Sequence, residues 1–168
     1  MPQALKKCLC LFDLSAAFDT IDHNILLSRL SSWFGITGTA LDCFQSYLST
    51  RPFRVKCESS FFLHTCFCGV PQGSVLGPLL FIIYTTPLSS LISSLSLNHH
   101  LYADDTQLFF SFHPPDVHWS IRYLHGALQQ ISSWVSSNFL TMNSSKTELP
   151  FIGLQHQLAK LQNSSHSL

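Results

Sequence analysis

The stretch that decides the fold runs from residue 99 to residue 110 and reads His-His-Leu-Tyr-Ala-Asp-Asp-Thr-Gln-Leu-Phe-Phe. Aromatic and β-branched residues on both sides of the Asp104-Asp105 pair predict a β-hairpin with both carboxylates at its turn. Asp-Asp is a poor choice for turn stability alone, because such turns prefer Asn-Gly or Asp-Gly and neighbouring carboxylates repel each other. A divalent cation would remove this repulsion by favouring the charged form of both side chains. The alternative is an ordinary exposed turn that carries two acids.

The composition indicates one domain with unusually little charge. The chain has 168 residues, of which 46% are hydrophobic and 11% are charged, whereas a typical soluble domain has about 25% charged residues. Such a chain exposes apolar surface, which usually marks contact with a partner. We therefore interpret it as part of a larger protein or as a domain that needs a partner. Its net charge of zero is not that of a complete nucleic-acid enzyme but is compatible with the catalytic core of one.

The cysteines and the N-terminus favour a reducing, intracellular setting. Cys8 with Cys10, and Cys66 with Cys68, are spaced two residues apart in strand-like runs, so each pair shares a strand face. Buried reduced thiols are one interpretation of these pairs, and a zinc site of four thiolates is the alternative. No secretory signal is visible, and the apolar run at 75–84 is too short for a membrane span. We expect a cytoplasmic or nuclear location and no membrane partner.

The order of the predicted elements indicates an α+β fold. Strands are predicted at 8–14, 53–57, 61–67, 101–103, 106–112 and 147–152, and helices at 23–34, 39–48, 75–84 with a kinked continuation to 91, and 116–135. Asp22, Ser74 and Asp116 are suitable N-caps, and Thr39 with Asp42 resembles a capping box. We expect the helices to pack on one face of an antiparallel sheet, and the tail at 154–168 to be loosely ordered.

Three acids in this order point to metal-dependent chemistry. Asp13 ends the first apolar strand, and Asp104 with Asp105 stand between two later strands. Antiparallel pairing of these strands would gather the three carboxylates at one edge of the sheet. Such hard oxygen ligands suit Mg²⁺, which also takes ligands from substrate phosphates. Two ions about 4 Å apart activate an attacking oxygen and neutralise a leaving one.

Four motifs resemble those of reverse transcriptases, in the wording of LINE-type retrotransposons, which lack long terminal repeats. Residues 11–23 read LFDLSAAFDTIDH, residues 69–78 read GVPQGSVLGP, residues 102–105 read YADD, and residues 143–148 read NSSKTE. Each alone is weak, but four in the right order are specific. The resemblance implies a reverse-transcriptase palm over residues 1–153, with the fingers and thumb largely missing.

The resemblance implies roles for four charged residues. Asp13, Asp104 and Asp105 would bind two Mg²⁺ ions, with Mn²⁺ as a possible substitute, and would be catalytic. Lys146 matches the lysine that protonates or neutralises the departing pyrophosphate, although one lysine in a polar stretch is often only solvated surface. Three unrelated turn acids are the alternative for the carboxylates.

The resemblance also implies binding roles. Phe18 matches the aromatic residue that would collide with a ribose 2′-OH. The alternative is that Phe18 only packs in the core. Gln72 and Gly73 match the loop that lines the nascent base pair. The alternative is that they only form the turn that leads into the next helix. Arg51 and Arg54 are candidates for contact with template or primer phosphate, or are simply surface residues.

The parent protein would be an RNA-directed DNA polymerase that adds dNTPs to the 3′-OH of a DNA primer on an RNA template. We expect weak or no processive activity from this chain alone, because the fingers, the thumb or the rest of a parent polyprotein would complete the enzyme. Two alternatives come from other classes of function. One is a non-catalytic retrotransposon remnant or binding module, and the other is a zinc-stabilised interaction domain that uses the cysteine pairs.

Overall fold

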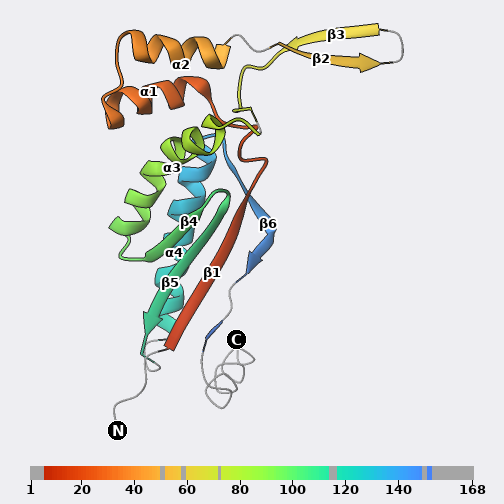
Figure 1. The fold of residues 1–168 in the computed structure, drawn as a ribbon. Helices are drawn as coiled ribbons and strands as arrows, with labels where there is room; N and C mark the ends of the chain where they lie inside the picture. Colours follow the sequence, from red (N-terminus) through yellow and green to blue (C-terminus); the bar gives the residue numbers. More distant parts are fainter. Residues whose placement is uncertain are drawn as a thin grey trace. The chain divides into compact units, whose positions relative to one another are not determined.

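The structure, a computed structural model, describes residues 6–49, 52–57, 60–71, 73–113, 117–148 and 151–152. Along these residues the chain forms four helices and seven strands (Figure 1). The helices are α1 (His23–Phe34), α2 (Thr39–Ser49), α3 (Leu76–Ser94) and α4 (Val117–Ser137). The strands are β1 (Lys6–Ser15), β2 (Pro52–Cys57), β3 (Ser60–Thr65), β4 (Asn98–Tyr102), β5 (Asp105–Phe112), β6 (Thr141–Glu148) and β7 (Phe151–Ile152).

The chain divides into two compact units. Unit 1 comprises the described residues within 1–13, 89–133 and 142–168, and unit 2 those within 14–88 and 134–141. Unit 1 contains a five-stranded sheet with the order β4-β5-β1-β6, in which β7 also pairs with β1. Both β4 and β1 run antiparallel to β5. The predicted α+β class with an antiparallel sheet is confirmed.

The β4–β5 hairpin differs from the prediction by one residue. Tyr102 pairs with Asp105, so the loop consists of Ala103 and Asp104, and Asp105 is the first residue of β5 rather than part of the turn. The alternating burial of β5 explains this register, because Thr106 and Leu108 are buried while Asp105 is exposed. A shift by one residue would turn the buried set to the other face. Ala103 has a positive φ of 51°, a conformation that non-glycine residues adopt rarely.

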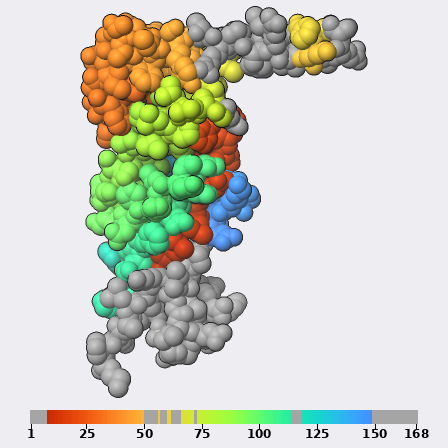
Figure 2. All heavy atoms as spheres, viewed as in Figure 1, coloured from red at the N-terminus to blue at the C-terminus, as the bar shows by residue number. Residues whose placement is uncertain are grey.

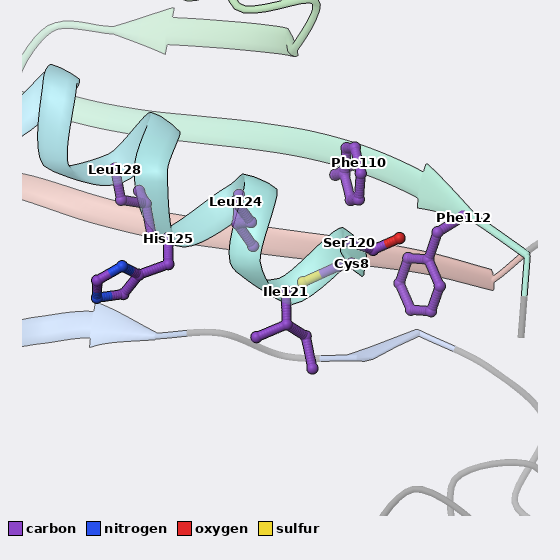
Figure 3. A pocket seen from close by; sticks show the side chains of 8 residues that line it. All are labelled: Cys8, Phe110, Phe112, Ser120, Ile121, Leu124, His125 and Leu128. Atoms are coloured by element: carbon purple, nitrogen blue, oxygen red, sulfur yellow. The ribbon is translucent and has the colours of Figure 1, made fainter. Parts of the chain in front are cut away.

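Helix α4 packs on one face of the unit 1 sheet, and the carboxylates of Asp13 and Asp105 lie on the other. Direct pairing places Cys8 with Phe110, Cys10 with Leu108, and Phe12 with Thr106 on one face. On this face residues of α4 line an apolar pocket together with Cys8 and Phe110 (Figure 3). The other face carries the alternate residues Leu9, Leu11, Asp13, Asp105, Gln107 and Phe109. Helix α4 therefore covers the face opposite to the one that carries Asp13.

The start and end of α1 follow its sequence signals. The Asp22 carboxylate accepts a hydrogen bond from the Ile25 backbone N–H at 2.9 Å, and Gly35 closes the helix with a φ of 67°. These contacts confirm the predicted helix and its cap. Helix α2 begins at Thr39 as predicted, but the Asp42 N–H donates to the Gly38 carbonyl. Gly38 is therefore the N-cap, and the proposed Thr39–Asp42 capping box was wrong.

Helix α3 is longer than the sequence pattern indicated. Ser74 caps its start as predicted, because its Oγ accepts the Gly77 N–H at 3.0 Å. The helix continues through Pro87 to Ser94, and Leu88 and Ile92 beyond the proline are buried. Burial of such side chains offsets the hydrogen bond that proline removes. By length and composition alone its 19 residues could cross a membrane, and 44% of that window is buried inside the structure.

A buried arginine holds the core of unit 2 together. The Arg29 guanidinium lies 4.5 Å from the ring centroid of Tyr84 and 5.3 Å from that of Trp134. It donates hydrogen bonds to the Tyr84 carbonyl and to Oδ1 of Asn138. These contacts connect α1, α3 and the end of α4, and no sequence pattern predicted them.

The predicted second hairpin is present, whereas the predicted last strand differs from the structure. The hairpin of β2 and β3 is confirmed, with Cys57 paired to Ser60. The last strand, predicted at 147–152, is in fact two strands that begin at Thr141. The predicted Asp116 cap and the tail at 154–168 lie outside the described residues.

Candidate active site

Three carboxylates come together at one end of the unit 1 sheet. Asp13 on β1 pairs directly with Asp105 on β5, and directly opposite residues have Cβ atoms about 5 Å apart on the same face. Asp104 precedes Asp105 in the hairpin loop. The pairing of β1 with β5 therefore places the lone acid next to the acidic pair.

Strand β6 brings two further polar groups to Asp13. Figure 2 shows atoms of β6 in blue against those of β1 in red. The Lys146 Nζ lies 3.0 Å from Oδ2 of Asp13, and the Lys146 side chain is 64% exposed against 9% for Asp13. The Asn143 Nδ2 donates to the same Oδ2 at 3.2 Å. A buried carboxylate thus receives one charged and one neutral donor on a single oxygen.

The electrostatics of this cluster support an ionised Asp13. The hydrogen bond from Lys146 lowers the pKa of Asp13 most, burial opposes it, and the bonds with Asn143 and Asp104 lower the pKa further. The pKa of Lys146 is raised, first by its hydrogen bond and charge interaction with Asp13 and then by the charges of Asp104 and Asp105. Lys146 therefore interacts with all three carboxylates, and these four side chains form one charged cluster.

The Lys146 ammonium offsets only part of the negative charge of this cluster. Among the described residues, no three His, Cys, Asp or Glu side chains lie close enough together to hold one metal ion. Asp13 is paired with Lys146 instead. The donor chemistry of the cluster, three carboxylates, is nevertheless the hard oxygen set that Mg²⁺ prefers.

A local turn explains how Asn143 and Lys146 both reach Asp13. Residues three apart on a regular strand face opposite sides of a sheet. Here Oδ1 of Asn143 accepts the Ser145 N–H at 3.2 Å, which is an Asx turn, and Thr147 Oγ1 donates to the Asn143 carbonyl at 3.0 Å. The motif at 143–148 gave no predicted role to Asn143, although an Asn two residues before a serine in a polar stretch is a signal for such a turn.

Phe18 and the second motif lie together within unit 2. The Phe18 ring is half-buried and stacks on Phe81 with centroids 4.7 Å apart. The Val70 N–H donates to the Phe18 carbonyl at 2.8 Å. Gly69 has a φ of 83°, and a Cβ on it would lie 2.9 Å from the backbone oxygen of Asp19. Only glycine permits this close approach of the two motifs.

The other predicted binding residues are only partly described. Gly73 has a φ of 77° and open space where a Cβ would stand, so its backbone conformation, not crowding, requires glycine. Arg54 lies on β2, opposite Leu63 of β3. Gln72 and Arg51 lie outside the described residues.

The apolar pocket of unit 1 is not part of the carboxylate cluster. It is lined by Cys8, Phe110, Phe112, Ser120, Ile121, Leu124, His125 and Leu128, with a volume of about 170 Å³ (Figure 3). Cys8 and Asp13 face opposite sides of β1, and five residues of strand span about 17 Å. The pocket offers no carboxylate and lies on the helix-covered face.

The cysteine pairs do not share one environment. Cys8 and Cys10 are buried, whereas Cys66 and Cys68 are exposed, so the prediction of buried thiols is confirmed for the first pair and wrong for the second. Burial raises the pKa of Cys8, and burial together with the charge of Cys8 raises the pKa of Cys10 to about 11. A high pKa disfavours the thiolate that zinc requires.

Comparisons with known sequences agree with the motifs. The family model described as reverse transcriptase (RNA-dependent DNA polymerase) matches residues 1–160. The probable RNA-directed DNA polymerase from transposon BS of Drosophila melanogaster is 30% identical over 156 residues, which are 85% of this chain and 16% of that protein. The RNA-directed DNA polymerase from mobile element jockey of Drosophila funebris is 35% identical over 104 residues, or 57% of this chain and 11% of that protein. The chain thus spans less than a fifth of the length of these relatives.

Solved structures share the fold at low sequence identity. Telomerase from Candida tropicalis in complex with a fragment of telomeric RNA has a TM-score of 0.73 and 15% identity, covering 91% of this chain and 27% of that one. The apo telomerase of the same organism, truncated from its C-terminal domain, has a TM-score of 0.72 and 16% identity, covering 90% of this chain and 32% of that one. At this identity the likeness extends to the fold alone.

Proposed function

Because the chain belongs to the reverse transcriptase family, in its LINE-type branch, we propose that it supplies the catalytic carboxylates of an RNA-directed DNA polymerase. This polymerase adds deoxynucleotides to a primer 3′-OH on an RNA template. The observation that carries the proposal is the charged cluster of Asp13, Asp104, Asp105 and Lys146. Of the residues that the motifs single out, these are the ones whose chemistry suits phosphoryl transfer.

Asp13, Asp104 and Asp105 are the proposed ligands of two Mg²⁺ ions, or of Mn²⁺ in their place. The lowered pKa of Asp13 keeps it ionised at neutral pH, as a metal ligand must be. When bound, the ions would activate the primer hydroxyl and neutralise charge on the phosphates.

Lys146 is the proposed partner of the departing pyrophosphate. Its raised pKa keeps the ammonium protonated at neutral pH, so it has both a positive charge and a proton to offer. Its side chain is mostly exposed, which leaves it free to move from Asp13 to a substrate oxygen.

Phe18 is the proposed residue that excludes a ribose 2′-OH. Its half-buried ring is held by the stack on Phe81, and a fixed aromatic edge discriminates by steric collision. Gln72 and Gly73 are proposed to line the nascent base pair. Arg51 and Arg54 are proposed to contact nucleic-acid phosphates.

The rest of a longer parent protein is the proposed source of the fingers and thumb. Its partners would be an RNA template, a DNA primer and dNTPs. An intracellular site, cytoplasmic or nuclear, suits the free thiols of Cys8, Cys10, Cys43, Cys66 and Cys68.

Primer extension on an RNA template tests this function. The wild-type chain with Mg²⁺ or Mn²⁺ should extend a primer weakly, and Asp13→Asn, Asp104→Asn and Asp105→Asn should each reduce the rate by roughly 10³-fold, because metal catalysis contributes several kcal/mol. Asp42→Asn, an exposed acid on α2, is the matched control and should leave the rate unchanged. Extension that survives in both Asp104→Asn and Asp105→Asn contradicts the assignment. A wild-type chain that neither extends primers nor binds Mn²⁺ would instead match a retrotransposon remnant.

A further inference from the structure

We propose that Asn143 is a positioning residue that orients Asp13 for the catalytic cation, and that Ser145 holds the Asn143 amide in place. This inference rests on the proposed function, because it concerns the metal ligands named there. It assigns a role to a residue that lies beside the charged cluster but carries no charge itself.

The first step is the fixed orientation of the Asn143 amide. Its Oδ1 accepts two hydrogen bonds from Ser145, one from the backbone N–H at 3.2 Å and one from the hydroxyl at 2.6 Å. With the oxygen held on this side, the Nδ2 group is directed to the other side, where it donates to Oδ2 of Asp13 at 3.2 Å. The Asx turn therefore determines which end of the amide Asp13 meets.

The second step is the choice of oxygen on Asp13. Both Asn143 and Lys146 engage Oδ2, so these two donors leave Oδ1 to other ligands. Hydrogen bonds to one oxygen of a ligating carboxylate fix its orientation, and loss of such a partner typically costs 10–100-fold in metal affinity, a rough range across metal sites.

The two donors to Asp13, Asn143 and Lys146, differ in charge. Asn143 is neutral and half-buried, so it does not compete with a cation for Asp13. The Lys146 ammonium does compete, because it neutralises the same carboxylate and interacts with Asp104 and Asp105. The two contacts must therefore have opposite effects on cation affinity, although both stabilise the ionised Asp13.

Titration of the full chain with Mn²⁺, followed by the electron paramagnetic resonance signal of the free ion, tests the inference without any need for catalysis. Asn143→Leu should weaken Mn²⁺ binding by about 10–100-fold, and Ser145→Ala should weaken it less but in the same direction. Lys146→Met should tighten binding. Ser144→Ala is the matched control for Ser145→Ala, since Ser144 is the exposed neighbour in the same strand, and should leave binding unchanged.

Four outcomes contradict the inference. Wild-type affinity in Asn143→Leu overturns the role of Asn143 and leaves the proposed function intact. Equal weakening by Asn143→Leu and Lys146→Met overturns it as well, because a general loss of structure at β6 would explain both. No Mn²⁺ binding by the wild-type chain overturns the proposed function and the inference together. If Asn143→Leu does not fold, as judged by circular dichroism, equal affinities in Ser145→Ala and Ser144→Ala overturn the inference.

Discussion

At the scale of the residue, Asp13 owes its ionisation to its neighbours. Burial alone would raise the pKa of its carboxyl, but the hydrogen bonds with Lys146 and Asn143 lower it by more. A folded-state pKa below the unfolded value means that the ionised carboxylate stabilises the fold. This contribution is complete above the unfolded pKa of about 3.9 and is lost as the pH falls through the lower folded pKa.

This linkage predicts a pH-dependent difference between the wild type and Asp13→Asn. Above about pH 5 the wild type should be the more stable, and its free energy of unfolding should fall more steeply than that of the variant as the pH drops towards about 2. Urea unfolding at a series of pH values measures this difference. Asp42→Asn should retain the steep fall, and identical pH profiles for the wild type and Asp13→Asn would show that the carboxylate is not stabilised by folding.

At the scale of the element, short-range signals predicted the structure best where one side chain meets the backbone a few residues away. The Asp22 cap and the Gly35 terminus of α1 are such cases, and so is the Ser74 cap of α3. The predicted continuation of α3 past Pro87 ended at residue 91, whereas the helix runs to Ser94, because a sequence signal is local while the burial of Leu88 and Ile92 comes from the surrounding core.

The Asp22 cap predicts a measurable loss of stability. Asp22→Ala removes the acceptor of the Ile25 N–H and should lower the free energy of unfolding by about 1 kcal/mol. Asp22→Asn keeps a side-chain oxygen and should retain most of that stability. Asn24→Ala, an exposed residue in the first turn of the same helix, is the control and should change it by less than about 0.5 kcal/mol. Chemical denaturation compares the variants, and equal stabilities of Asp22→Ala and wild type would exclude a stabilising cap.

At the scale of the whole molecule, the shortage of charge is matched by exposed apolar side chains. Val75 is 95% exposed and Phe67 is 84% exposed, and both belong to unit 2. In contrast, the helix-covered face of the unit 1 sheet buries Cys8 and Cys10. The reactivity of the cysteines therefore measures which of these surfaces are buried in the folded chain.

Thiol alkylation should divide five of the cysteines into two classes. Cys43, Cys66 and Cys68 are exposed and should react with iodoacetamide at pH 8. Cys8 and Cys10 should be protected, and a pKa of about 11 for Cys10 alone slows its reaction by roughly 10²-fold, because the thiolate is the reactive form. Peptide mapping by mass spectrometry measures the rates, and denaturant should equalise them. Equal rates in the folded chain would contradict the burial of β1.

The sequence by itself determined the helices, the Asp22 and Ser74 caps, the two hairpins and the four acidic or basic residues of the cluster, because each depends on residue type and short spacing. Tertiary structure alone decided that Asp13 faces Asp105 across the strand pair, and that β6 begins early enough to bring Asn143 to the same oxygen as Lys146. Both results join segments about 90 to 130 residues apart. Their register is set by which faces of the strands are buried together, and local propensity carries no information about that pairing.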